Sequence, residues 1–262
     1  MLTPSEFLGG DRKRPAVRQI FGVSGSGKTT LLESWGRDSV KSKSFPKNWR
    51  LIVIDVKAED YGSIAEPITD LEAAMKSINE NRATVYYPGV HTASEDVETM
   101  IDYLFHLIDR QKDFQATLIL EESSTYITAH TVPDQIKRMA VQGRSKGLAL
   151  ILANQRMMNN KWLDTQTAHL LAFQCPIPDR DMIKKRWGLD GNAISDRLAT
   201  KPFSFAHFDF NSLQLRYYAP IPLQENQDPI PQDQLAQDPG EESDDQNVKG
   251  SMMDLFNRSS WR

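Results

Sequence analysis

Residues 22–29, with the sequence GVSGSGKT, match the pattern G-x-x-x-x-G-K-[ST] at every fixed position. In such a loop, backbone N–H groups and the positive end of the following helix surround the β- and γ-phosphates of a nucleotide. Lys28 would contact the phosphate oxygens, and the hydroxyl of Thr29 would bind Mg²⁺. The pattern therefore predicts a site for ATP and Mg²⁺ rather than a glycine-rich turn without a ligand. The residues expected to bind the nucleotide are Ser24, Gly25, Ser26, Gly27, Lys28, Thr29 and Thr30.

Two adjacent acidic residues, Glu121 and Glu122, follow the apolar run 116–120. Hydrolysis of a bound nucleotide needs a metal clamp and a group that orients the attacking water. Glu121 is expected to support Mg²⁺, usually through water, and Glu122 to polarise the attacking water as a general base. Because successive strand residues point to opposite faces, the two carboxylates are expected to do different jobs. Without the phosphate-binding loop, a solvated strand end would be the preferred interpretation.

The segments that would position these residues alternate between strand and helix patterns. Residues 17–21 form a short apolar run before the loop, and residues 30–35 begin a helical pattern after it. The clearest helix is 92–111, where Thr92 and Glu95 have capping-box spacing. Strands separated by helices predict an α/β fold with a mostly parallel sheet and helices on both faces. Further strands are expected at 50–55, 83–87, 116–122, 148–153 and 170–175, an antiparallel terminal pair at 203–210 and 212–219, and further helices from Pro133 and near Trp162.

The composition of the 262-residue chain, 39% hydrophobic, is sufficient for one sizeable core with appendages. Apolar runs fall short of the 18 or so residues that a transmembrane helix needs, and the N-terminal sequence lacks the apolar stretch of a signal peptide. Cys175 is the single cysteine and lies in an apolar run, which favours a buried side chain over a nucleophile. The five histidines show no metal-ligand spacing. We therefore expect an intracellular protein that is not secreted.

The composition changes after residue 220, where Pro, Gln, Asp and Glu replace most large apolar residues. Such a segment buries too little surface to offset its ordering entropy, so residues 221–262 are expected to form a disordered tail and residues 1–220 an ATPase domain. The tail ends in an apolar cluster, Met252 to Phe256, which reads either as a short binding motif or as a terminus without a role. The net charge is −4 for the chain, −7 for 223–250 and +1 for 251–262, which leaves +2 for 1–222. A mildly basic body is compatible with contact to a polyanion.

Four segments occur in the order found in the FtsK–HerA superfamily of ring-forming DNA translocases, which this chain resembles. The resemblance covers about residues 17–218, and that superfamily includes the genome-packaging ATPases of membrane-containing, tailless viruses. Many families share the phosphate-binding loop, so the segment 143–156 is what selects this superfamily. The resemblance implies a RecA-like P-loop NTPase fold. The four segments are VIDVKAEDY (53–61), LILEES (118–123), GRSKGLALILANQR (143–156) and FQCPIPDRDMIKK (173–185).

The resemblance also implies roles for two further residues. The amide of Gln155, at the end of a strand, would meet the γ-phosphate or the attacking water. Arg144 would project from the edge of one subunit and stabilise charge in the neighbour's nucleotide site. The alternative for Arg144 is a cation favoured by the dipole at a helix C-terminus. One departure concerns the metal: Glu121 stands where the family usually has Asp, so a contact through water is easier to expect than direct coordination.

The resemblance therefore implies an ATP-driven translocase of double-stranded DNA, working as a ring of five or six identical subunits. Packaging of a viral genome into a preformed capsid is the expected task, in the host cytoplasm or at the virion vertex. The tail would contact capsid or vertex proteins. A cellular or plasmid DNA pump, and an assembly protein that binds ATP without turnover, stay open as alternatives.

Other classes of nucleotide-binding protein fit the sequence less well. A small-molecule kinase would usually carry an arginine-bearing lid, for which we find no convincing segment. A GTPase would carry a base-reading [NT]-K-x-D motif, which is absent from the sequence. Basic and aromatic residues are interleaved at 41–50 and 184–187, where they would either contact phosphates or form solvated faces.

Overall fold

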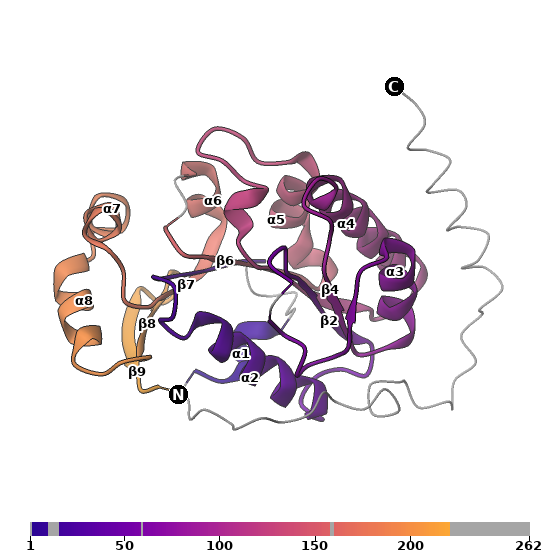
Figure 1. Ribbon diagram of the computed structural model, residues 1–262, viewed down its shortest axis with the longest axis horizontal. Coiled ribbons are helices and arrows are strands. Elements are labelled where there is room, and N and C mark those ends of the chain that lie inside the picture. Colours follow the sequence, from indigo (N-terminus) through magenta and orange to yellow (C-terminus); the bar gives the residue numbers. More distant parts are fainter. Residues whose placement is uncertain (1, 10–15, 59, 158–159, 221–262) are drawn as a thin grey trace.

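One nine-stranded sheet runs through the part of the chain described by the computed structural model, residues 2–9, 16–58, 60–157 and 160–220 (Figure 1). Its strand order is β3-β4-β2-β5-β6-β1-β7-β8-β9, with parallel pairing from β3 to β7 and antiparallel pairing of β7 with β8 and of β8 with β9. The predicted α/β class, with a mostly parallel sheet and a terminal antiparallel pair, is confirmed. The strands are β1 (Val17–Phe21), β2 (Trp49–Ile54), β3 (Pro67–Ile68), β4 (Ala83–Tyr86), β5 (Gln115–Leu120), β6 (Leu148–Asn154), β7 (Thr167–Ala172), β8 (Phe205–Asp209) and β9 (Gln214–Tyr218).

Helices cover both faces of this sheet. Helices α3, α4, α5 and α6 lie on one face, α1 and α2 lie on the other, and α7 and α8 lie at the end of the sheet near β8 and β9 (Figure 1). The helices are α1 (Pro4–Leu8), α2 (Lys28–Lys41), α3 (Leu71–Glu80), α4 (Ala93–Arg110), the short 3-10 helix η1 (Ser123–Thr125), α5 (Asp134–Lys146), α6 (Lys161–Gln166), α7 (Ile177–Trp187) and α8 (Gly191–Ala199).

The apolar runs of the central strands explain why both faces must be covered. Along β5, Leu118 and Leu120 belong to the core under α3, α4 and α5, whereas Ile119 belongs to the core that contains α1 and α2. The strand is buried at each of these positions. Because alternate side chains enter opposite cores, a strand with no polar face can be stable only between two helical layers.

Two local predictions were wrong. The strand predicted at 170–175 begins at Thr167 and ends at Ala172, because it pairs with β1, whose last residue, Phe21, lies opposite Ala172. The capping box predicted for Thr92 and Glu95 does not form. Thr92 has a helical ψ of −13°, and its hydroxyl donates instead to Asp96 Oδ2 at 2.7 Å.

None of the helices in the described ranges is both long and apolar enough to cross a membrane. The predicted tail, residues 221–262 with its apolar cluster, lies outside the described residues.

Candidate nucleotide-binding site

The phosphate-binding loop connects the end of β1 to the start of α2, as the sequence predicts. Its conformation depends on two glycines. Gly27, directly before α2, has a φ of 99°, a left-handed value that L side chains rarely adopt. A Cβ atom at Gly22 would lie 2.6 Å from the Cβ of Phe173 on the neighbouring segment, which leaves no room for a side chain.

Lys28 lies inside the loop. Only 6% of it is exposed, and its Nζ donates to the carbonyl oxygens of Gly22 at 2.7 Å and Val23 at 3.1 Å. Burial lowers the pKa of Lys28, and the nearby charges of Glu121 and Glu122 partly oppose that shift. Ser26 is also buried, and its Oγ has no hydrogen-bond partner among the described residues. A buried cation beside an unpaired hydroxyl fits a phosphate group.

Glu121 faces the residue predicted to bind the metal. Its Oε1 lies 3.5 Å from Thr29 Oγ1, and its Oε2 accepts a hydrogen bond of 2.8 Å from the hydroxyl of Tyr61. Burial raises the pKa of Glu121 to about 7, although the Tyr61 hydrogen bond and the charge of Lys28 lower it.

The oxygen atoms around Thr29 fit Mg²⁺, which is bound in proteins through one or two carboxylates together with substrate phosphates. The described residues contain no group of three or more His, Cys, Asp or Glu side chains that could hold a metal ion. A magnesium ion here would therefore depend on Thr29, Glu121 and the phosphates of the nucleotide.

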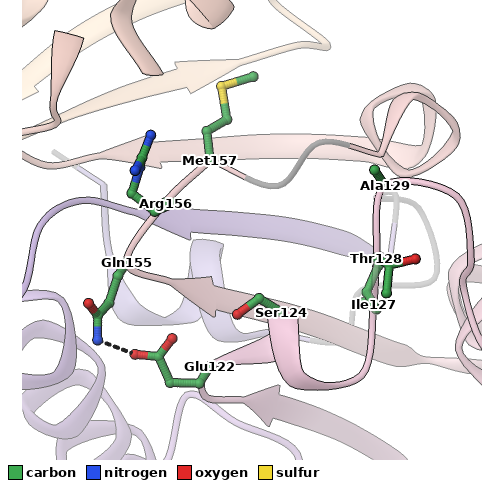
Figure 2. A pocket seen from close by; sticks show the side chains of 8 residues that line it. All are labelled: Glu122, Ser124, Ile127, Thr128, Ala129, Gln155, Arg156 and Met157. Carbon is green, nitrogen blue, oxygen red and sulfur yellow. Dashed lines mark hydrogen bonds between the residues drawn. The ribbon is translucent and has the colours of Figure 1, made fainter. Parts of the chain in front are cut away.

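Glu122 has different partners. Its Oε1 lies 2.5 Å from Lys57 Nζ and accepts a hydrogen bond of 2.8 Å from Gln155 Nε2 (Figure 2). Its φ of 47° is left-handed, which costs a non-glycine residue about 1–2 kcal/mol. Strained backbone of this kind is common at functional sites. The two adjacent acids thus have different partners, because Glu121 faces Thr29 whereas Glu122 faces Gln155.

The ends of β5 and β6 are held together by side chains. Asn154 Nδ2 donates to Ser123 Oγ at 2.7 Å, and its Oδ1 accepts from the backbone N–H of Ser124 at 2.7 Å. Asn154 and Ser123 are both buried. This pair of hydrogen bonds holds the turn after Glu122 against Asn154, the residue before Gln155, and so keeps Glu122 and Gln155 side by side.

A cavity of about 380 Å³ opens beside Glu122 and Gln155 (Figure 2). Arg156 borders it, and the Arg156 guanidinium binds both carboxylate oxygens of the buried Asp179 at 3.0 to 3.2 Å. The cavity gives a molecule outside the chain access to the Glu122 carboxylate. Its lining residues are Glu122, Ser124, Ile127, Thr128, Ala129, Gln155, Arg156 and Met157.

Arg144 is not brought together with the other predicted residues. It is exposed in the last turn of α5, just before the start of β6 at Leu148. Gln155 follows the other end of β6, seven residues and roughly 20 Å along the strand. Arg144 therefore lies near the N-terminal ends of the parallel strands, whereas the phosphate-binding loop of the same chain lies at their C-terminal ends.

Three site residues were not predicted: Asp55, Lys57 and Tyr61. All three lie in the segment 53–61, which begins with the last two residues of the buried strand β2 and continues with mostly polar residues. The carboxylate of Asp55, fully buried, accepts from the backbone N–H groups of Lys57 at 3.0 Å and Asp60 at 3.2 Å. Asp55 thereby shapes the loop that presents Lys57 to Glu122 and Tyr61 to Glu121.

The fold and the loop together are those of the P-loop NTPases. No protein-family model and no curated protein sequence matches the chain. Among solved structures, the chain is similar to the genome-packaging NTPase B204 from Sulfolobus turreted icosahedral virus 2 in complex with ATP-gammaS. The TM-score is 0.62 at 20% identity, over 79% of this chain and 98% of that chain.

Two further solved structures extend this comparison. The DNA-packaging ATPase B204 from Sulfolobus turreted icosahedral virus has a TM-score of 0.59 at 18% identity, over 79% of this chain and 98% of that one. EssC (ATPases 2 and 3) from Geobacillus thermodenitrificans has a TM-score of 0.54 at 12% identity, over 92% of this chain and 44% of that one. The resemblance inferred from the sequence segments is thus confirmed at the level of the fold.

Proposed function

We propose that the chain is a magnesium-dependent ATPase that moves double-stranded DNA and packages a viral genome into a preformed capsid. The proposed ATPase activity rests on the position of two carboxylates at the C-terminal end of β5. Glu121 lies beside Thr29 of the phosphate-binding loop, and Glu122 lies beside Gln155.

The residues divide the work of hydrolysis between them. The loop N–H groups and Lys28 bind the phosphates, and a magnesium ion held by Thr29 and Glu121 would neutralise charge on the transferred phosphoryl group. Glu122 accepts the proton of the attacking water, and Gln155 orients that carboxylate. Burial lowers the pKa of Lys57, but the hydrogen bond and charge of Glu122 outweigh this and raise it. Lys57 thus stays charged and holds Glu122 until substrate arrives.

The DNA substrate is supported by the order of the four sequence segments and by the similarity in fold to genome-packaging ATPases over nearly their whole length. The direct test is ATPase activity of the purified chain with and without double-stranded DNA. We expect turnover that DNA stimulates and that Lys28→Ala abolishes. Turnover without any response to DNA would contradict translocation, and binding without turnover would favour an assembly protein.

We further propose a ring of five or six subunits in which Arg144 serves the neighbouring site. The distance of Arg144 from its own phosphate-binding loop supports this, and the cavity beside Glu122 offers an entry for a guanidinium from another chain. An arginine supplied in trans accelerates phosphoryl transfer about 10³–10⁵-fold. Mixing inactive Arg144→Ala subunits with inactive Lys28→Ala subunits should restore part of the activity. No rescue at any ratio, with both variants assembled, would contradict action in trans.

The tail, residues 221–262, is proposed as a tether that docks the ATPase domain, residues 1–220, to capsid or vertex proteins, in the host cytoplasm or at the virion vertex. A tethered docking segment raises the effective concentration of the motor at its docking site. Deletion of 221–262 should leave DNA-stimulated ATPase activity intact and reduce packaging. Unimpaired packaging by the truncated protein would contradict the docking role.

A further inference from the structure

The turn between α8 and β8 exposes a large aromatic side chain. Phe203 is 52% exposed, and its φ of 63° is left-handed. Such a backbone is uncommon for a bulky residue and is destabilising. Neither the exposed ring nor the left-handed backbone of Phe203 stabilises the hydrophobic core, so both features need another explanation.

The turn is held rigidly on both sides of Phe203. Ser204 donates from its Oγ to the carbonyl of Lys201 at 2.6 Å and from its N–H to the same oxygen at 3.1 Å. The next residue, Phe205, is buried and stacks on Phe173 with ring centroids 5.4 Å apart. Phe203 is therefore fixed in place by its neighbours rather than carried on a loose loop.

Phe203 lies directly against the phosphate-binding loop. A Cβ atom at Gly27 would meet Phe203 Cδ1 at 3.3 Å and Phe203 Cβ at 3.4 Å, and Phe173 Cε1 follows at 3.7 Å. Gly27 immediately precedes Lys28, whose Nζ lies inside the loop. The nucleoside of a bound triphosphate must leave the loop near this first turn of α2, because the loop itself encloses only the phosphates.

We propose that the exposed face of Phe203 stacks on the base of the bound nucleotide and forms the base subsite of this chain. The inference rests on the proposed nucleotide-binding function and extends it to the nucleoside. Stacking on an aromatic ring tolerates any base, because every base has a π-face. This agrees with the absence of a base-reading [NT]-K-x-D motif in the sequence, and it predicts that ATP and GTP bind with similar affinity.

The test compares a nucleotide with its phosphates alone. Binding of MgATP and of magnesium tripolyphosphate to the full chain is measured by calorimetry, before and after Phe203→Ala. Loss of a stacked base weakens binding by roughly 5- to 100-fold. We expect that loss for ATP and for GTP, no change for tripolyphosphate, and restored ATP affinity in Phe203→Trp.

Leu213 provides a matched control. It is 74% exposed with a φ of 54°, and it lies in the turn between β8 and β9 at the other end of β8. Leu213→Ala removes a similar exposed apolar side chain from a similar left-handed backbone. It should leave the affinity for both ligands unchanged, because it does not approach the loop.

The remaining outcomes separate this inference from the proposed function. If Phe203→Ala weakens ATP and tripolyphosphate equally, Phe203 merely supports the loop and the base subsite is wrong. The same follows if the unaltered chain binds tripolyphosphate as tightly as ATP, although the phosphate site then stands. If the unaltered chain binds neither ligand, the nucleotide-binding function fails and the base subsite fails with it.

Discussion

The surroundings of Glu121 and of Glu122 differ in burial, partners and backbone geometry, although the two residues are adjacent in the sequence. Glu121 is 2% exposed and is held between Thr29 and Tyr61. The side chain of Glu122 is 13% exposed on a left-handed backbone and is held by Lys57 and Gln155 beside an open cavity. A buried, fixed carboxylate suits support of a metal ion, and an accessible carboxylate with a basic neighbour suits proton transfer.

The largest effect is expected for Glu122. Replacement by Gln keeps the shape and removes the proton acceptor, so kcat should fall about 10²–10⁴-fold while ATP still binds. Single-turnover hydrolysis and calorimetry on the same preparation measure the two quantities. Full activity in Glu122→Gln would assign the general base to another residue and remove the distinction between the two acids.

Loss of the partner of Glu122 should have a smaller effect. Gln155→Leu removes the 2.8 Å hydrogen bond to the carboxylate and leaves its charge. Hydrogen bonds to charged groups contribute about 1.5–3 kcal/mol, so kcat should decrease roughly 10- to 100-fold with KM nearly unchanged. A rise in KM at constant kcat would mean that Gln155 binds the nucleotide and does not orient Glu122.

Glu121 should give the protein a pH-dependent stability without nucleotide or metal. Burial raises its pKa from 4.5 to about 7, so between these values the folded chain binds a proton that the unfolded chain has released. The free energy of unfolding therefore falls by about 3 kcal/mol as the pH rises through this range. Urea denaturation should find this decrease in the unaltered chain and a flatter profile in Glu121→Gln. Identical profiles would contradict the effect of burial on this carboxyl group.

The smallest effect is expected for the hydroxyl that holds Glu121. Tyr61→Phe should raise the Mg²⁺ concentration needed for tight nucleotide binding about 10-fold, because partners of metal ligands orient them. Tyr86→Phe is the control. The hydroxyl of Tyr86 also donates to a carboxylate, Asp96 Oδ2 at 2.9 Å, but Asp96 is not a proposed metal ligand. The Mg²⁺ requirement should be unchanged in the control. An equal change in both variants would indicate a general loss of stability.

The sequence predicts the fold and the main carboxylates because local signals encode them. The phosphate-binding loop, the buried strands and the acids after β5 each fall within a short, continuous segment. Tyr61 could not be predicted as a partner of Glu121, because the contact joins residues 60 positions apart and depends on a left-handed φ of 70°. The approach of Phe203 to Gly27 is likewise set by tertiary packing. The capping box predicted at Thr92 was wrong because the sequence shows the spacing of Thr92 and Glu95 but not the backbone conformation of Thr92.

The ion pair between Arg156 and Asp179 has a mechanical consequence. Arg156 directly follows Gln155, and its guanidinium binds both oxygens of Asp179 in the first turn of α7. Gln155, which contacts Glu122, and Arg156, which binds α7, are therefore consecutive residues. Helices α7 and α8 pack against each other at the end of the sheet (Figure 1). Under the proposed mechanism, a displacement of Gln155 on release of the γ-phosphate would be transmitted through Arg156 and Asp179 to α7 and α8.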